Sequence, residues 1–88
     1  VESMTNARLV AEYNALVPYM EEHDLSFEGP LVRKEELLSE MNIRLTRYDY
    51  YEDYKDAFGE EAAAGIKNYP AYQRAAASDI TPLREFMG

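Results

Sequence analysis

Apolar residues recur at helical spacing in the first twenty positions. They follow one another at intervals of four, three and four residues, which places them on one face of a helix. The members of this face are Leu9, Tyr13, Leu16 and Met20. Thr5 carries the side chain of a preferred N-cap, so it marks the start of the helix. Pro18 has no backbone N–H, and we expect the helix to kink or restart there.

A second helical pattern follows a connecting segment. Residues 25–30 read LSFEGP, and their Gly-Pro pair is a strong break in any regular element. Because proline suits the first turn of a helix, Pro30 predicts a helix over about residues 30–41. The buried side of this helix is expected to consist of Leu37, Leu38 and Met41.

The next stretch, NIRLT, is compatible with two structures. Ile43 and Leu45 alternate as in a short strand, whereas a tight turn between two helices fits equally well. Thr46 is then the predicted N-cap of a third helix, with Asp49 completing a capping box. Two helices joined in this way over residues 30–58 would have the form of a helix-turn-helix.

Glycine and proline divide the remainder of the chain into short segments. Gly59 is expected to end the third helix, because glycine commonly occupies the position after a helix. The EEAAAG segment is expected to form a short helix that stops at Gly65. Further helices are predicted to start at Pro70 and at Thr81, where a cap or a first-turn proline is present.

The chain as a whole is predicted to form one small all-α domain, residues 1–88, with four to six short helices. A minor β element near residues 25–27 or 43–45 is the remaining alternative. Residues 1–3 have two explanations. They are left over from an expression vector ahead of a native start at Met4, or an initiator methionine has been removed.

Residues 47–56, RYDYYEDYKD, contain half of the tyrosines of the chain. At about 100° per residue, the aromatic side chains of a helix over this segment gather on one side and the acids on the opposite side. The predicted core side consists of Tyr50, Tyr51, Tyr54, Ala57 and Phe58, and the acidic side of Asp49, Glu52, Asp53 and Asp56. Tyr48 lies on the flank and is the tyrosine expected to be exposed.

The net charge of −8 is unevenly distributed, because residues 1–61 hold 15 acids against 6 bases. Such a chain repels phosphate backbones and attracts basic surfaces. Acids four residues apart on the predicted third helix repel one another, at about 0.2–0.5 kcal/mol per pair. A functional anionic face is one explanation of this pattern, and solubility is the other. The predicted partner-binding residues are Asp49, Glu52, Asp53, Asp56, Glu60 and Tyr48.

Residues that carry most enzyme chemistry are absent or isolated. The chain has no cysteine, and its one histidine is His23 in the sequence EEHD. Consecutive side chains point in different directions on a helix, so His23 is better explained as a partner of the helix dipole than as a metal ligand. No phosphate-binding glycine loop, nucleophile motif or dinucleotide fingerprint occurs. We expect no enzymatic activity, no cofactor and no metal.

A cytoplasmic location without membrane contact is expected, since no apolar run approaches the roughly 20 residues of a membrane span. The function expected first is that of a small acidic binding or regulatory protein, which docks its anionic helix face onto a basic protein surface. Its most specific form inhibits a nucleic-acid-processing factor by mimicking phosphates.

Two alternatives belong to other classes of function. The first is a helix-turn-helix regulator that binds nucleic acid, but Asp49 and Asp53 would then face the DNA backbone and oppose binding. The second is a structural or assembly adaptor, which includes the case of a homodimer.

Overall fold

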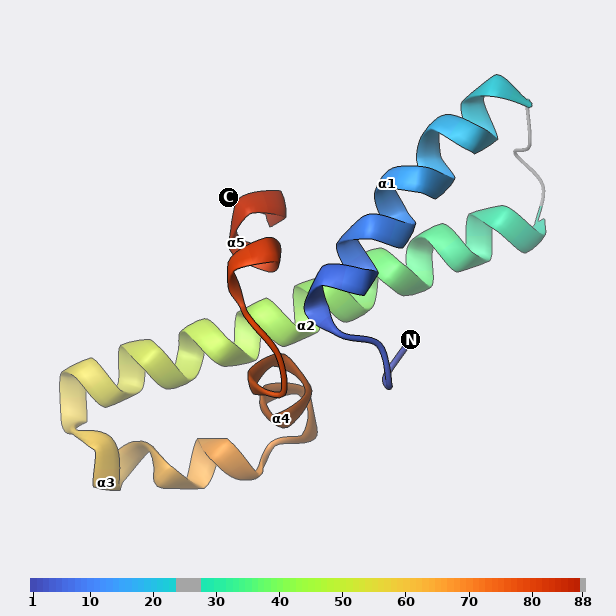
Figure 1. Ribbon diagram of the computed structural model, residues 1–88. Coiled ribbons are helices and arrows are strands. Elements are labelled where there is room, and N and C mark those ends of the chain that lie inside the picture. Colours follow the sequence, from blue (N-terminus) through green and yellow to red (C-terminus); the bar gives the residue numbers. More distant parts are fainter. Residues whose placement is uncertain (24–27, 88) are drawn as a thin grey trace.

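The computed structural model describes residues 1–23 and 28–87, which form five α-helices and one 3₁₀ helix without a strand (Figure 1). The elements are α1 (Asn6–Glu22), α2 (Glu28–Phe58), α3 (Glu60–Ala63), the 3₁₀ helix η1 (Ala64–Asn68), α4 (Pro70–Ala76) and α5 (Thr81–Met87). The predicted all-α class is confirmed. The β alternative at 43–45 is wrong because these residues are helical, and the one at 25–27 lies outside the described residues.

A single helix, α2, replaces the two helices and the turn predicted over residues 30–58. The helix-turn-helix form is therefore wrong. The capping roles of Thr46 and Asp49 are wrong too, since both residues lie inside α2. Nothing in NIRLT forces a break, because it contains neither glycine nor proline and its residues cost a helix at most about 0.7 kcal/mol each. Each residue added to an existing helix also gains a backbone hydrogen bond.

Continuity of α2 also preserves one inward-facing stripe. Its residues follow at intervals of four, three, four and three, so they lie along one side of the helix. They are Leu37, Met41, Arg44, Tyr48 and Tyr51, of which all but Tyr48 are buried. A break within NIRLT would rotate the second half of this stripe away from the first. Tertiary packing therefore favours the unbroken helix.

The first helix, α1, starts where the sequence predicts. The Thr5 hydroxyl oxygen accepts a hydrogen bond of 3.1 Å from the Arg8 backbone N–H, which makes Thr5 the N-cap. α1 then continues through Pro18 to Glu22, so the predicted restart at Pro18 is wrong. Proline removes one donor from the helix interior, and the helix has only one turn left to run at that point.

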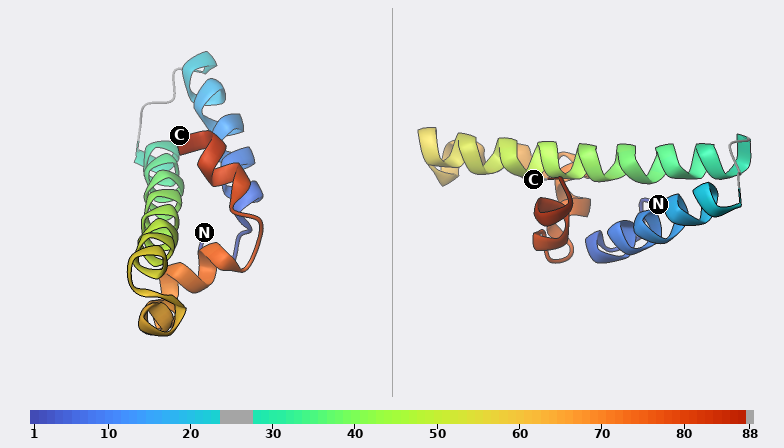
Figure 2. Two further views of the ribbon diagram at one scale, coloured as in Figure 1. Left: turned by 90° about the vertical axis from the view of Figure 1, so that its left-hand side faces the viewer. Right: turned by 90° about the horizontal axis from the view of Figure 1, so that it is seen from above.

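The other helices all pack against α2, which is the longest element of the molecule. α1 runs antiparallel to the first half of α2, and after Gly59 the chain reverses so that α3 and η1 return along the second half (Figure 1). None of the described helices covers one long side of α2 (Figure 2). At about 1.5 Å per residue, α2 is about 46 Å long. It therefore spans most of the longest molecular dimension of 50 Å.

Two apolar clusters hold the other helices on α2. The larger cluster joins α1, α2 and α5 and consists of Leu9, Leu37, Met41 and Leu83. The smaller cluster joins α2 to α3 and η1 and consists of Tyr51, Ala63 and Ile66. Leu38, predicted to be buried, is only partly buried at the edge of the larger cluster.

The predicted breaks in the second half of the chain are correct with one exception. α2 ends before Gly59, whose φ of 94° is strained for residues with a side chain. α4 starts at Pro70 and α5 at Thr81, as expected. The stop predicted at Gly65 is wrong, because the helical path tightens into η1 and continues through Gly65 to Asn68.

A buried arginine in α2 ties the start of the chain to the domain. The Arg44 side chain is 0% exposed, and its guanidinium donates five hydrogen bonds of 2.6 to 3.1 Å. The acceptors are the backbone carbonyls of Val1, Glu2 and Met4 and the side chains of Asn6 and Glu40. Residues 1–4 are thus part of the packed domain, whatever their origin.

Glu40 extends the Arg44 network to α4. Arg74 donates from Nε to Glu40 Oε2 at 2.6 Å and from Nη2 to Oε1 at 3.1 Å, while Arg44 Nε donates to the same Oε2 at 2.6 Å. Burial alone would raise the pKa of Glu40, but the hydrogen bonds from Arg74 and Arg44 outweigh it. The pKa therefore lies below its ordinary value of 4.5.

This shift predicts a pH-dependent contribution to stability. A carboxyl whose pKa is lower in the folded state stabilises the fold above its unfolded pKa. That contribution is lost as the pH falls through the folded pKa. Replacing Glu40 with glutamine should therefore destabilise the domain most at neutral pH, and the deficit should shrink below pH 4.5. Urea unfolding of both proteins across this range measures the difference. A deficit independent of pH would contradict the role of the ionised carboxylate.

Candidate protein-binding surface

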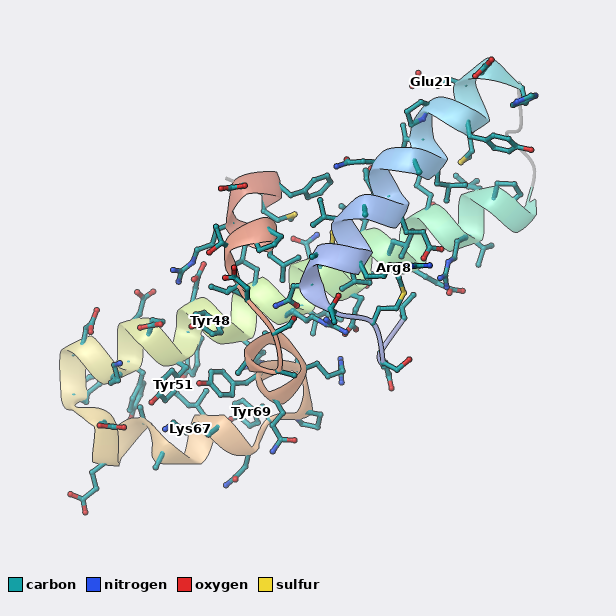
Figure 3. All side chains as sticks on the ribbon, viewed as in Figure 1. Arg8, Glu21, Tyr48, Tyr51, Lys67 and Tyr69 are labelled. Atoms are coloured by element: carbon teal, nitrogen blue, oxygen red, sulfur yellow. The ribbon has the colours of Figure 1, made fainter. Side chains whose placement is uncertain are left out.

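The four tyrosines of α2 are divided between the interior and the surface. Tyr51 is buried between α2 and η1, where it faces Lys67 (Figure 3), and its ring centroid lies 4.8 Å from that of Tyr72. Tyr48 stacks on the other side of Tyr72, with centroids 5.8 Å apart and an interplanar angle of 14°. The exposure predicted for Tyr48 is therefore wrong, because its ring is half-buried against α4.

The predicted core side of this segment is correct for Tyr51 and in part for Tyr54, but wrong for its other three residues. Tyr50 is 47% exposed and Phe58 is 67% exposed, whereas both were expected to face the core. The core is reached instead through Tyr48 and Tyr51, which continue the stripe of Leu37 and Met41. The prediction treated residues 46–58 as a separate helix and placed its densest aromatic side inward. The register set by the first half of α2 turns the core side by roughly a quarter of a turn.

Cationic side chains lie over several of the tyrosine rings. The Arg84 guanidinium carbon lies 5.3 Å from the Tyr48 ring centroid, and Lys67 Nζ lies 5.2 Å from that of Tyr51. Arg47, on the exposed side of α2, lies 4.6 Å from the Tyr69 ring centroid and 5.9 Å from that of Tyr50. Such contacts contribute about 0.5–1 kcal/mol each at exposed sites. They favour side-chain conformations in which the basic groups lie against the rings.

The predicted acidic residues fall into two groups. Three of them have a basic neighbour on the same chain: Asp49 pairs with Arg84 at 3.1 Å, Glu52 with Lys55 at 3.9 Å and Glu60 with Lys67 at 3.8 Å. Asp53 and Asp56 are exposed and have no ion-pair partner among the described side chains. Only this second group keeps its full charge available to another molecule.

The exposed acids and the exposed aromatic rings share the uncovered side of α2. Asp53 lies roughly 60° from Tyr50 around the helix axis, and Asp56 lies roughly 120° from it on the same flank. On the other flank, Arg47 lies over the ring of Tyr69, which comes from the connection between η1 and α4. A shallow depression lined by Asn42, Ile43, Thr46 and Arg47 continues the same side toward the middle of α2.

Two parts of this surface were missed from the sequence. Tyr69 lies in a connection just before Pro70, and no periodic pattern links it to Arg47. Arg47 was not among the predicted partner-binding residues. The one available signal was the spacing of the buried stripe across residues 37–51, which places Tyr50 and Arg47 outward if the helix is continuous.

Within residues 1–23 and 28–87, no group of three or more His, Asp or Glu side chains is arranged to hold a metal ion. His23 is the C-cap of α1, and its ring lies 4.4 Å from that of Tyr19. The described helices include none that is both long enough and apolar enough to span a bilayer.

Comparisons of the chain with known proteins extend the description no further. No protein-family model, no curated protein and no solved structure matches it.

Proposed function

We propose that this chain is a binding protein that docks the uncovered side of the C-terminal half of α2 onto a basic surface of a protein partner. The proposal rests on two properties of Asp53 and Asp56, their exposure and their lack of an ion-pair partner within the described part of the chain. Both carboxylates are exposed on the side of α2 that none of the described helices covers, and no described basic side chain neutralises them.

Electrostatics favour such a partner over other classes. A net charge of −8 attracts basic surfaces and accelerates their association at low ionic strength. The like-charged pairs Asp49–Asp53 and Glu52–Asp56 weaken the isolated helix slightly, so a bound cationic partner relieves their repulsion. A partner that uses its basic surface for nucleic acid would be blocked by the same carboxylates, which is the inhibitory form of the proposal.

The nucleic-acid-binding alternative depended on a helix-turn-helix, and the fold does not contain one within the described residues. In helix-turn-helix docking, a short second helix enters the major groove while the first crosses the backbone. α2 is instead one helix of 31 residues, and its outward side carries Asp53 and Asp56. Carboxylates at that position oppose binding to phosphate.

The proposal predicts salt-sensitive binding that depends on two residues. The probe is a dye-labelled synthetic helical peptide of leucine and lysine, with its lysines along one edge of the leucine face. Fluorescence anisotropy at about 50 mM salt should detect binding, and raising the salt to about 300 mM should weaken it strongly. The double variant D53N/D56N should bind about tenfold more weakly, which is the loss of about 1.4 kcal/mol.

A matched control is provided by the end of α1. The variant E21Q/E22Q removes the same charge from another exposed helical position, and it should change the affinity by no more than about twofold. Equal weakening by both variants would mean that only net charge matters and would contradict a docking site on α2. Binding that does not respond to salt would favour the adaptor alternative instead.

A further inference from the structure

A row of three aromatic rings, exposed at Tyr50 and Phe58 and half-buried at Tyr54, lies beside the acids on α2. The ring centroids of Tyr50 and Tyr54 are 6.0 Å apart, and those of Tyr54 and Phe58 are 4.8 Å apart. Arg47 joins this row to Tyr69 by its position over both Tyr69 and Tyr50. We call this surface the aromatic strip; it consists of Arg47, Tyr50, Tyr54, Phe58 and Tyr69.

Tyr54 of the aromatic strip packs against the smaller buried cluster, but the other rings of the strip do not. Tyr69 is 43% exposed, Tyr50 and Phe58 are more so, and none of the three belongs to either buried cluster. Contiguous exposed apolar side chains on a small protein commonly mark an interaction surface. Tyrosine, phenylalanine and arginine are also the residue types enriched in the centres of protein interfaces.

The position of Arg47 indicates a surface that is already ordered. Its guanidinium lies between the rings of Tyr50 and Tyr69, which come from α2 and from the connection before α4. Two segments that are distant in the chain are thus held in register before any partner binds. Binding then costs less side-chain entropy than it would for freely rotating groups.

The charges around the aromatic strip select the kind of partner. Asp53 borders the strip at Tyr50, and Asp56 follows on the same flank, whereas the opposite flank is closed by η1 and α4. We propose that the strip is the contact centre of a docking surface for an amphipathic protein segment, apolar in the middle and lined with Lys or Arg along one edge. This inference rests on the proposed function and adds that apolar contact, with charge, determines affinity.

The test uses the same leucine–lysine peptide and a second peptide in which serine replaces every leucine. Affinity for the leucine–lysine peptide should fall about tenfold in the double variant Y50S/F58S. The double variant Y19S/L31S is the matched control, because Tyr19 and Leu31 are 51% and 38% exposed outside the strip. It should change the affinity by no more than about twofold, and the serine–lysine peptide should bind all forms weakly. Thermal unfolding checks that each variant is folded.

The possible outcomes separate this inference from the proposed function. If D53N/D56N weakens binding and Y50S/F58S does not, the aromatic strip is not the contact centre, and the acidic docking site stands. If neither variant affects binding, or the leucine–lysine peptide does not bind, both are wrong. Sedimentation equilibrium tests the rival occupant, a second copy of the chain. A dimer that dissociates in Y50S/F58S would overturn the choice of a basic segment.

Discussion

Replacing Arg44 with alanine is expected to lower the free energy of unfolding by about 3–5 kcal/mol, which is a large part of the stability of a domain of this size. The substitution leaves Glu40 with only one of its two arginine partners. It also leaves the buried side-chain oxygen of Asn6 without its donor, and it removes the donor of the part-buried carbonyls of Val1, Glu2 and Met4. A buried acceptor without a partner is costly, because folding removes its hydrogen bonds to water and supplies none in their place. Urea unfolding followed by circular dichroism measures the change.

The matched control for Arg44 is another arginine of α2. Arg33 pairs with Glu12 at 2.7 Å, but both side chains are partly exposed, so R33A should cost no more than about 1 kcal/mol. R44K should lie between the two, since a lysine keeps the charge but lacks the planar group that reaches five acceptors. Similar unfolding free energies for R44A and R33A would show that the network around Arg44 does not hold the fold.

Replacing Arg47 with proline is the second substitution with a large expected effect, and it distinguishes the continuous helix from the predicted turn. If Thr46 capped a new helix, position 47 would be its first residue, where proline is favoured. Inside α2, proline removes a hydrogen bond and clashes with the preceding turn. We therefore expect R47P to lower the free energy of unfolding by about 3 kcal/mol or more.

The variant R47A separates the backbone effect from the loss of the side chain. It removes the contacts with Tyr50 and Tyr69 while leaving the helix intact, and it should cost no more than about 1–2 kcal/mol. Chemical denaturation of R47A and R47P side by side gives the cost of the proline itself. Equal stability of the two variants would contradict an unbroken α2.

Local signals in the sequence predicted most helix ends correctly. Thr5, Gly59 and Pro70 act through their own side chain or backbone geometry, so a single residue is enough to place a boundary. The boundary at Thr81 is also correct, but Thr81 is the first residue of α5 and not its cap. Pro18 and Gly65 failed as boundaries because each has only a local preference. α1 continues for one more turn after Pro18, and the chain tightens into η1 around Gly65, so neither residue ends its helical segment.

The length of α2 was not predictable from local preference, because NIRLT neither favours nor forbids a helix strongly. The decisive signal was the stripe that continues from Leu37 to Tyr51, but Arg44 interrupts its apolar character. A buried arginine is rarely expected at a core position without knowledge of its partners. One partner, Glu40, lies one turn earlier on α2, but the other four acceptors come from residues 1–6 of the chain, and no spacing rule connects them with α2.

The candidate surface was predicted only in part, because helical periodicity does not show how α2 is rotated against the core. That Asp53 and Asp56 are exposed follows from helical periodicity and needs no tertiary information. Which aromatic residues join them depends on the rotation of the helix against the core, so Tyr48 and Tyr50 exchanged their expected places. Tyr69 joins the candidate surface only because the chain reverses at Gly59 and returns along α2.

The measurement that tests the central claim most directly is the mapping of amide chemical shifts by nuclear magnetic resonance during titration with the leucine–lysine peptide at low salt. The claim is that the uncovered side of the C-terminal half of α2 is a docking surface for a basic partner. It predicts that the largest shifts fall within residues 47–61 and at Tyr69. Shifts concentrated on α1 or on residues 28–41 of α2 would contradict it.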